Sequence, residues 1–342
     1  MSIAKIQLTN FRNFKKKVID FSQEVTVIVG PNASGKTNIL EALYLLSAGK
    51  SFRARVEDEM IGYGAETARV SGSVVDSNLE TVLTHGDNGW PRKKLLVNGV
   101  PKRLIDFTGN FQVVLFGPWD LDLVTASPSL RRNFLDMVLS QVDREYRRAS
   151  LSYEKGLRQR NRLLFRIREE GLSRGQLLFW NQLLIKNGDL LSAKREDFIE
   201  FANLQAGLND QKFQLEYDKS AISEARLEQY AEEEVAAATT LVGPHRDDFV
   251  FRITNDESRN LSSFGSRGEQ RMAVLWLKLA ELAFIKEKIR EQPTLLLDDI
   301  LSELDHEHRK VVIGILGRQQ TIITTADEHF VKGFRKVNRI DL

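Results

Sequence analysis

The sequence of 342 residues contains no cysteine, and this absence excludes several kinds of site. Disulfide frameworks, cysteine-ligated zinc sites, iron–sulfur clusters and thiol nucleophiles all require that residue. The chain also lacks an apolar run of roughly 18 residues, the length that a helix needs to cross a bilayer. Its first ten residues show no basic segment followed by an apolar one, so no secretory signal is predicted. We therefore expect a soluble, cytoplasmic protein with no membrane partner.

Neither sign of charge is in large excess. The 49 Lys and Arg residues nearly balance the 47 Asp and Glu residues, which leaves a net charge of +2. Such a balance neither requires nor excludes a nucleic-acid partner. Hydrophobic residues make up 42% of the chain and charged residues 28%, as in soluble globular proteins rather than disordered ones. The length predicts roughly two domains, each able to fold without covalent cross-links.

The pattern of apolar residues changes along the chain and predicts an α/β domain that is interrupted by helices. Residues 1 to about 125 combine short strands with a helix over 37–48, and Asn98-Gly99 predicts a hairpin turn. Helical patterns then cover 130–170, 175–206 and 223–238. Strands return at 248–253, 294–297 and 320–324, with a helix over 268–288. The predicted domains are therefore residues 1–127 with 241–342, and a helical arm over 128–240.

Charge is distributed unevenly within the predicted arm. Residues 128–175 contain twelve Lys and Arg against six Asp and Glu, whereas residues 176–240 contain six against twelve. One interpretation is a solvated helical hairpin whose opposite charges pair with each other. The other is a basic strip that faces DNA. The residues that suggest such a strip are Arg144, Arg147, Arg148, Arg158, Arg160 and Arg162.

A glycine-rich segment predicts a nucleotide site. It reads Gly30-Pro31-Asn32-Ala33-Ser34-Gly35-Lys36-Thr37, which matches the G-x-x-x-x-G-K-[ST] motif between a predicted strand and a predicted helix. Glycines let backbone N–H groups curl around phosphate oxygens, and the helix N-terminus adds positive potential. The Lys36 ammonium reaches the β- and γ-phosphates, and the Thr37 hydroxyl can ligate Mg²⁺. The segment therefore predicts a nucleotide and Mg²⁺ as ligands.

A second segment supplies the acidic residues that such a site needs. Pro293-Thr294-Leu295-Leu296-Leu297 is an apolar strand that ends in Asp298 and Asp299. The carboxyl ends of parallel strands meet at the edge of the sheet where nucleotide phosphates bind. Asp298 is predicted to hold Mg²⁺, and Asp299 to polarise the attacking water. Alone the pattern is weak, because acids also cap helices.

Ser266-Arg267-Gly268-Glu269-Gln270-Arg271 precedes a long amphipathic helix. Two interpretations fit this segment. The free N–H groups of a helix start can bind an anion such as a γ-phosphate. By spacing alone, an ordinary N-cap with acidic and amide residues in the first turn is favoured.

The order of these segments resembles that of ABC-type ATPases, and within them the chain is similar to the bacterial RecF family, which is related to SMC heads. Two segments discriminate best: Arg131-Arg132-Asn133-Phe134-Leu135-Asp136 and Gly243-Pro244-His245-Arg246-Asp247-Asp248. Further matching segments are Leu8-Thr9-Asn10-Phe11-Arg12-Asn13-Phe14, Thr37-Asn38-Ile39-Leu40-Glu41-Ala42, Ser127-Pro128 and Ser302-Glu303-Leu304-Asp305. The resemblance implies an ABC-type ATPase head, with a mixed sheet and an antiparallel β lobe, that is split by an α-helical insertion arm.

The resemblance also implies how the site works. Two monomers are expected to form an ATP-dependent homodimer, with ATP between the Gly30–Thr37 loop of one and Ser266 and Gly268 of the other. Gln112 is expected to contact Mg²⁺ and the γ-phosphate as a Q-loop residue, although an exposed strand residue is the alternative. Ser302-Glu303-Leu304-Asp305 is expected to cross the dimer interface as the D-loop, or to begin a helix capped by Ser302.

The chain departs from the family pattern at several positions. The usual switch histidine after the last strand is absent, and Thr325 is expected to take part of its role. The second acid is Asp299 rather than glutamate, which shortens its reach, so we expect a weak, DNA-stimulated ATPase. Trp119 stands where an acid usually precedes Asp120. His245 follows Gly-Pro, where histidine is more often a structural hydrogen-bonding residue.

The function implied by the resemblance is ATP-gated DNA binding in recombinational gap repair, with roles in replication and the SOS response. ATP would close the dimer on double-stranded or gapped DNA, and RecR with RecO would complete a pathway that loads RecA. Two other classes share the nucleotide motifs: a transporter's ATP-binding subunit and an SMC-like architectural protein. The roughly 260 residues between the two nucleotide motifs are too few for a long coiled coil. A scaffold that uses ATP only to dimerise stays open.

Overall fold

The computed structural model describes residues 2–75, 77–86, 92–254, 258–327, 329 and 337–342. Contacts divide the chain into two compact units, Met1–Asp122 with Leu277–Leu342, and Leu123–Trp276. We call them the first and the second unit. The second unit includes strands and part of a helix that the sequence analysis assigned to the ATPase head. The domain boundaries of 127/128 and 240/241 stay a prediction.

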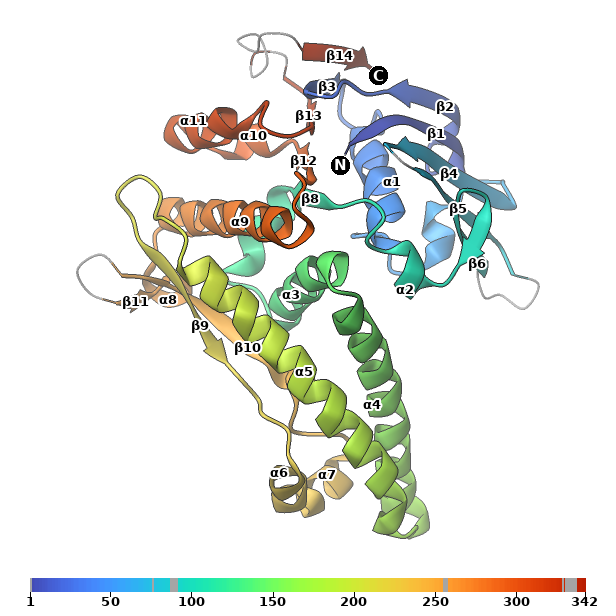
Figure 1. The fold of residues 1–342 in the computed structure, drawn as a ribbon, viewed down its shortest axis with the longest axis vertical. Helices are drawn as coiled ribbons and strands as arrows, with labels where there is room; N and C mark the ends of the chain where they lie inside the picture. Colours follow the sequence, from blue (N-terminus) through green and yellow to red (C-terminus); the bar gives the residue numbers. More distant parts are fainter. Residues whose placement is uncertain (1, 76, 87–91, 255–257, 328, 330–336) are drawn as a thin grey trace. The chain divides into compact units, whose positions relative to one another are not determined.

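Six strands of the first unit form an antiparallel sheet (Figure 1). In their order of pairing they are β2 (Phe14–Asp20), β1 (Ile3–Phe11), β4 (Thr67–Val74), β5 (Ser77–Thr84), β6 (Arg92–Val97) and β7 (Val100–Lys102). The turn between β6 and β7 places Asn98 at φ 52° and Gly99 at φ 77°. Two adjacent positive φ angles are what a two-residue type I′ turn requires, so the predicted hairpin is confirmed.

The other sheet of the first unit is parallel. Its order is β14 (Val337–Asp341), β3 (Val25–Val29), β13 (Thr321–Thr325), β12 (Thr294–Asp298) and β8 (Val113–Phe116). Every residue of β3, β8, β12 and β13 is buried. Continuous burial is typical of parallel strands that are covered on both faces. Because all five strands point the same way, β3, β12 and β13 end at one edge.

Helix α1 (Lys36–Ala48) connects the two sheets of the first unit. It contacts β4 and β5 of the antiparallel sheet, and β8, β12 and β13 of the parallel sheet. Its residues from Ile39 to Ser47 are all buried, as expected of a helix covered on opposite faces. The shorter helices of this part of the chain are η1 (Glu57–Met60), α2 (Leu104–Phe107), η2 (Pro118–Leu123), α10 (Ile300–Glu303) and α11 (His306–Ile315).

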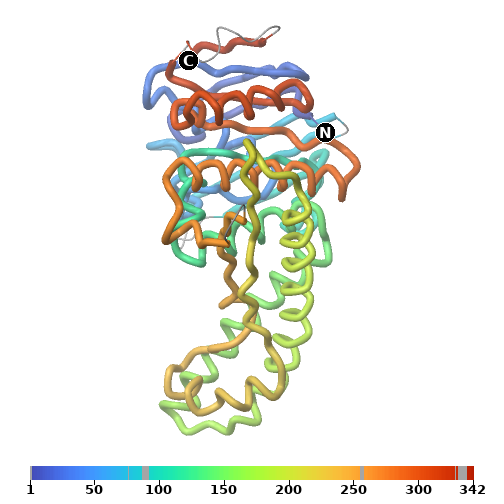
Figure 2. The backbone as a smooth tube through the Cα atoms, turned by 90° about the vertical axis from the view of Figure 1, so that its left-hand side faces the viewer, coloured from blue at the N-terminus to red at the C-terminus, as the bar shows by residue number. Residues whose placement is uncertain are grey.

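Three helices of the second unit are α3 (Pro128–Val142), α4 (Arg144–Glu170) and α5 (Leu178–Asn203). Helices α4 and α5 contact each other, and Figure 1 shows them approaching toward the end where residues 171–177 connect them; Figure 2 shows the same helices after a 90° turn. The second unit also contains a three-stranded sheet, in the order β11 (Arg259–Asn260), β10 (Asp248–Ile253) and β9 (Phe213–Asp218). The remaining helices are η3 (Arg174–Leu177), α6 (Glu224–Gln229), α7 (Ala231–Ala237), η4 (Pro244–Arg246), α8 (Leu261–Phe264) and α9 (Arg267–Ile289), which continues into the first unit.

Among the described residues, no helix is both long enough and apolar enough to span a membrane.

Two details add to the pattern predicted for the arm. Between the predicted helical stretches 175–206 and 223–238 lies a strand, β9, in which buried Phe213 and Leu215 alternate with exposed Gln214 and Glu216. That alternation has the period of a strand. The pattern over 130–170 forms two helices rather than one, because the Asp143 carboxylate caps α4 by accepting from the N–H groups of Glu145 at 2.8 Å and Tyr146 at 3.0 Å.

A buried carboxylate, Asp247, organises the core of the second unit. It accepts hydrogen bonds from the Arg195 guanidinium at 3.0 Å, from the Ser220 N–H at 2.8 Å and from the Tyr217 hydroxyl. Arg195 is itself buried and donates to Asp136 at 2.8 Å and to the Pro244 carbonyl at 2.7 Å. This network ties α3, α5 and β9 to the segment that precedes β10.

The two most discriminating sequence segments contact each other around this network. Arg131 binds both carboxylate oxygens of Asp248, at 2.6 and 2.9 Å. Arg132 donates to the Asp247 carbonyl at 2.9 Å. Such bidentate pairs fix geometry as well as charge. Segments about 110 residues apart in the chain are thus held together by charge-assisted hydrogen bonds.

His245 belongs to the same core, and its hydrogen bonds define its role. One ring nitrogen, Nε2, donates to the Thr240 carbonyl at 3.0 Å, so the other, Nδ1, accepts from the Tyr153 hydroxyl at 2.9 Å. This arrangement needs the neutral ring. Burial lowers the pKa of His245 to about 4. His245 is therefore a structural hydrogen-bonding residue, as its sequence context indicates.

Removing the Asp247 carboxylate should destabilise the second unit strongly. In Asp247→Ala the Arg195 guanidinium stays buried without one of its counter-charges, which typically costs about 3–5 kcal/mol. Urea unfolding followed by circular dichroism measures this loss. The matched control is Lys219→Ala, which removes an exposed ion pair to Glu196 and should cost less than about 1 kcal/mol. Equal effects of the two substitutions would contradict the assigned role.

The stability of the chain should fall in acid partly because of His245. Its folded pKa of about 4 lies below the ordinary 6.5, so the unfolded chain binds the proton more tightly. The contribution of the neutral His245 ring to the free energy of unfolding is complete above pH 6.5 and is lost as the pH falls toward 4. The loss should be on the order of 3 kcal/mol, at roughly 1.4 kcal/mol for each pKa unit. Unfolding free energies of the unsubstituted chain and of His245→Gln, measured from pH 7 to 4, should converge in acid; parallel curves would contradict this.

Candidate nucleotide-binding site

The loop between β3 and α1 has the backbone of a phosphate-binding loop. Ala33 and Gly35 adopt positive φ angles of 66° and 107°. A Cβ atom on Gly35 would lie 2.6 Å from the Phe14 ring and 2.8 Å from the Asn13 amide, so glycine is required there on two grounds. The Asn13 amide also donates to the Ser34 carbonyl at 3.1 Å. Asn13 and Phe14, at the turn between β1 and β2, thus contact the phosphate-binding loop and restrict its conformation.

Lys36 lies at the centre of this loop. Its buried ammonium donates to the Gly30 carbonyl at 2.6 Å and to the Pro31 carbonyl at 2.9 Å. Lys36 is also the first residue of α1, so the free N–H groups of the helix N-terminus lie beside its backbone. A lysine and the N-terminus of a helix together provide the positive potential that a polyphosphate needs.

Three oxygen-bearing side chains meet at the edge of the parallel sheet. The Thr37 hydroxyl donates to Asp298 Oδ1 at 3.1 Å, and the Thr324 hydroxyl donates to the same oxygen at 2.6 Å. Burial raises the pKa of Asp298, although both hydrogen bonds act in the opposite direction. Mg²⁺ prefers such oxygen ligands and takes its remaining ones from phosphates and water. Thr37 and Asp298 therefore fit the predicted magnesium site, and Thr324 orients Asp298.

Asp299 follows in a left-handed conformation, with φ 48°. Its N–H lies 3.1 Å from both the carbonyl and the hydroxyl oxygen of Thr324. Asp tolerates this backbone region better than most residues. The end of β13 thus fixes the backbone that carries the second acid, next to Asp298. Thr324 was not among the predicted site residues, and Thr325 was; Thr325 is buried and bonds to Asp327.

Arginine side chains surround the buried carboxylate of Glu41 on α1. Arg12 binds both carboxylate oxygens of Glu41, at 2.8 and 2.6 Å. Arg53 and Ser51 donate to the same carboxylate at 2.8 and 2.6 Å. Burial opposes the charge of Glu41, but these donors outweigh it and lower the pKa. Arg12 and Glu41 were singled out in the sequence only as part of matching segments.

The position of Gln112 corrects its predicted role. Gln112 precedes β8, and its carbonyl accepts from the N–H of Thr294, the first residue of β12. Asp298 is the last residue of β12, so roughly 13 Å of extended strand separates the two ends. The Gln112 side chain is buried and donates to the Gly109 carbonyl at 2.7 Å. A contact with the metal at the opposite edge does not fit this geometry.

The segment after β8 does reach the correct edge. There the Trp119 ring stacks on Phe52, with centroids 4.9 Å apart and an interplanar angle of 24°. Next to it, buried Asp120 accepts from Lys278 at 3.1 Å, and Lys278 also binds Glu281 at 3.1 Å. Burial raises the pKa of Glu281 to about 7, although Lys278 acts against it. Asp120 thus anchors this segment to α9, and Trp119 packs at the surface.

The remaining predicted segments have defined local structures. In the second unit, Ser266 and Gly268 are exposed at the start of α9. In the first unit, Ser302-Glu303-Leu304-Asp305 joins α10 to α11, and the Ser302 hydroxyl donates to the Asp299 carbonyl at 2.6 Å. The helix cap there is Asp305, which accepts from the His308 N–H at 3.0 Å, rather than Ser302.

The arginines of the arm do not all face solvent. Arg160 is buried and donates to Glu234 at 2.6 Å and to Thr240 at 2.8 Å, so it does not belong to a surface strip. Arg147 is half-buried and donates to the Ser140 carbonyl at 2.6 Å. The exposed members of the predicted strip are Arg144, Arg148, Arg158 and Arg162. Their spacing places them along one face of α4.

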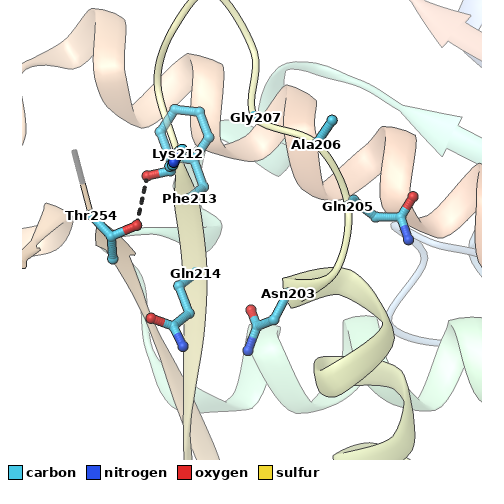
Figure 3. Close-up of a pocket in the computed structure, with 8 residues that line it drawn as sticks. All are labelled: Asn203, Gln205, Ala206, Gly207, Lys212, Phe213, Gln214 and Thr254. Atoms are coloured by element: carbon cyan, nitrogen blue, oxygen red, sulfur yellow. Dashed lines mark hydrogen bonds between the residues drawn. The ribbon is translucent and has the colours of Figure 1, made fainter.

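A polar cavity of about 340 Å³ lies between the end of α5 and β9 (Figure 3). Two of the side chains that line it, those of Asn203 and Gln205, form hydrogen bonds with backbone groups. Asn203 bonds to both the N–H and the carbonyl of Leu215, at 2.7 and 2.9 Å, and Gln205 donates to the Phe201 carbonyl at 3.0 Å. These bonds secure the edge of β9, and we assign no ligand to the cavity.

Comparisons with known proteins agree with this site. A family model described as an AAA ATPase domain matches residues 1–89. A DNA replication and repair protein RecF from Exiguobacterium sp. (strain ATCC BAA-1283 / AT1b) is 37% identical over 348 residues, which cover 96% of this chain and 93% of that protein. A solved structure of the recombination mediator protein RecF-ATP in the RecFOR pathway has a TM-score of 0.87 and 32% identity, covering 97% of this chain and 93% of that one.

A structure of the SMC head bound to the C-winged helix domain of ScpA has a TM-score of 0.53 and 19% identity, covering 98% of this chain and 92% of that one. At that identity the likeness concerns the fold alone. The expected α/β ABC-type head is thereby confirmed. Together with the near full-length sequence match, these findings show that the chain belongs to the RecF family.

Proposed function

We propose that this chain is an ATP-gated DNA-binding protein of recombinational gap repair, which also serves replication and the SOS response. The observation that carries the proposal is the meeting of Thr37, Asp298 and Thr324 beside the Lys36 loop. This arrangement provides the groups that bind and hydrolyse ATP. The family likeness, which includes a relative solved as RecF-ATP, supports the connection to DNA repair.

Each residue of the nucleotide site in the first unit has one role in the proposed ATP cycle. The ammonium of Lys36 and the backbone N–H groups of residues 32–37 would bind the phosphates. Thr37 and Asp298 would hold Mg²⁺, and the ion would supply positive charge that stabilises the negative charge of the phosphates. Asp299 orients the attacking water and accepts its proton. A carboxylate held close to the backbone has a shorter reach than glutamate, so hydrolysis is slow and acts as a timer.

The second half of the proposed site comes from another copy of the chain. Ser266 and Gly268 are exposed at the start of α9, where helix N–H groups and a hydroxyl can bind a γ-phosphate. Ser302-Glu303-Leu304-Asp305 begins three residues after Asp299 and would cross the interface. ATP thus joins two copies head to tail, and its hydrolysis separates them.

The proposed ligand is double-stranded DNA beside a single-stranded gap, and RecR acts with RecO to load RecA there. Exposed Arg144, Arg148, Arg158 and Arg162 give one face of α4 a row of cations. Contacts of this type go to phosphates, so binding is directed by shape and depends on salt. The proposed strip keeps these four of the six predicted residues, gives Arg147 a smaller part and leaves out buried Arg160.

Nucleotide-dependent DNA binding tests the proposal directly. Fluorescence anisotropy on a gapped duplex should show at least tenfold tighter binding with ATP than with ADP or without nucleotide. Lys36→Ala removes the charge that binds the phosphates and should abolish this difference. The matched control is Lys102→Ala, an exposed lysine of β7, which should behave like the unsubstituted chain. Binding that ignores nucleotide would indicate a static DNA-binding protein instead.

Salt dependence tests the strip on α4. Arg148→Ala and Arg158→Ala should each reduce the slope of log affinity against log salt concentration by about 1, because each removes one phosphate contact. Arg147→Ala should change the slope less, since its guanidinium is already bonded to a carbonyl. Unchanged slopes and affinities in the first two variants would remove the strip from the binding site.

A further inference from the structure

The start of α9 forms a closed hydrogen-bonded ring. Glu269 Oε2 accepts from the Ser266 N–H at 2.8 Å and from the Ser266 hydroxyl at 2.9 Å, while the Glu269 N–H donates back to that hydroxyl oxygen at 3.3 Å. This reciprocal arrangement is a capping box. The single hydroxyl proton of Ser266 is therefore already donated to a carboxylate.

One cation holds this ring in place. Arg259, on β11, forms an ion pair with Glu269 Oε1 and donates to the Phe264 carbonyl at 2.7 Å. From the other side, the Gln270 amide donates to the Leu261 carbonyl at 2.9 Å. The turn that carries Ser266 is thus fixed by side chains on both sides, and Arg259 is a close counter-charge of the carboxylate in the turn.

We propose that Arg259 and Glu269 are positioning residues that control when Ser266 binds the terminal phosphate of ATP. This inference rests on the proposed head-to-tail dimer. A phosphate that binds the Ser266 hydroxyl must displace Glu269 Oε2, and it then lies beside a carboxylate of the same charge. Repulsion between like charges at a few ångströms is substantial when water is excluded. Arg259 offsets this repulsion, so the pair sets the ATP concentration at which two copies join.

The surface around the turn allows such an approach. Ser266, Arg267 and Gly268 are exposed, and a Cβ atom on Gly268 would meet no atom within 4 Å. The Glu269 side chain is 17% exposed and that of Arg259 is 41% exposed. Solvent therefore reaches the groups that would bind the phosphate, while the competing carboxylate lies beneath them.

Substitutions that change charge but not shape separate this role from helix capping. Glu269→Gln keeps an acceptor for Ser266, because glutamine also forms capping boxes, but it removes the repulsion. The ATP concentration for half-maximal dimer formation, measured by sedimentation velocity, should fall about fivefold to tenfold. Arg259→Gln leaves the carboxylate uncompensated and should raise that concentration by a similar factor. The double variant should resemble Glu269→Gln, and Arg259→Lys should restore most of the normal response.

Two measurements keep the outcomes distinct. Arg252→Gln breaks the Arg252–Glu216 ion pair in the same sheet and should leave the ATP response unchanged. Binding of a fluorescent ATP analogue to the monomer should be equal in all variants, because the first unit is unaltered. If Glu269→Gln and Arg259→Gln weaken dimer formation alike, the pair is merely structural and the inference is wrong. If the unsubstituted chain forms no dimer with ATP, the proposed function itself is wrong, and the inference fails with it.

Discussion

The carboxylate of Asp298 ties together three segments that are far apart in the chain. Thr37 lies in the first turn of α1, Asp298 is the last residue of β12, and Thr324 lies near the end of β13. The hydroxyl groups of the two threonines donate to the same oxygen of the aspartate. The parallel direction of the strands makes the meeting possible, because their carboxyl ends share an edge. Burial disfavours the charge of Asp298, and a bound cation would favour it. The oxygen that accepts the two hydrogen bonds holding this edge of the sheet together is therefore also one that could bind the metal ion.

The second unit depends on a comparable arrangement that serves structure instead. Asp247, Asp248, Arg131 and Arg195 hold helices and strands together through charged hydrogen bonds away from water. A buried pair of this kind contributes specificity of geometry more reliably than net stability. The Arg-Arg-x-Phe-Leu-Asp and Gly-Pro-His-Arg-Asp segments, on which the resemblance to the family rests most, supply these contacts. Their residues form the contacts that define this unit, whereas the phosphate-binding loop is shared by many ATPases.

Local sequence patterns predicted the parts whose physics is local. The glycine-rich loop, the apolar strand that ends in Asp298 and the Asn98-Gly99 turn each depend on a few adjacent residues. The parts that failed depend on distant partners. Gln112 was assigned to the metal from the family resemblance, as a Q-loop residue, but strand register puts it at the other end of the sheet. Arg160 resembles its exposed neighbours in sequence, yet Glu234, 74 residues away, pairs with it in the interior. Nothing beside Thr324 in the sequence marks it as the partner of Asp298.

Both groups that would bind phosphate are already hydrogen-bonded within the chain. The Lys36 ammonium bonds to two carbonyls of its own loop, and the Ser266 hydroxyl bonds to Glu269. ATP must therefore replace existing bonds rather than add new ones to free groups. The net gain from such an exchange is a small difference between similar terms. Small differences are easily shifted by one nearby charge, and this sensitivity suits a site whose ligand must be released again after hydrolysis.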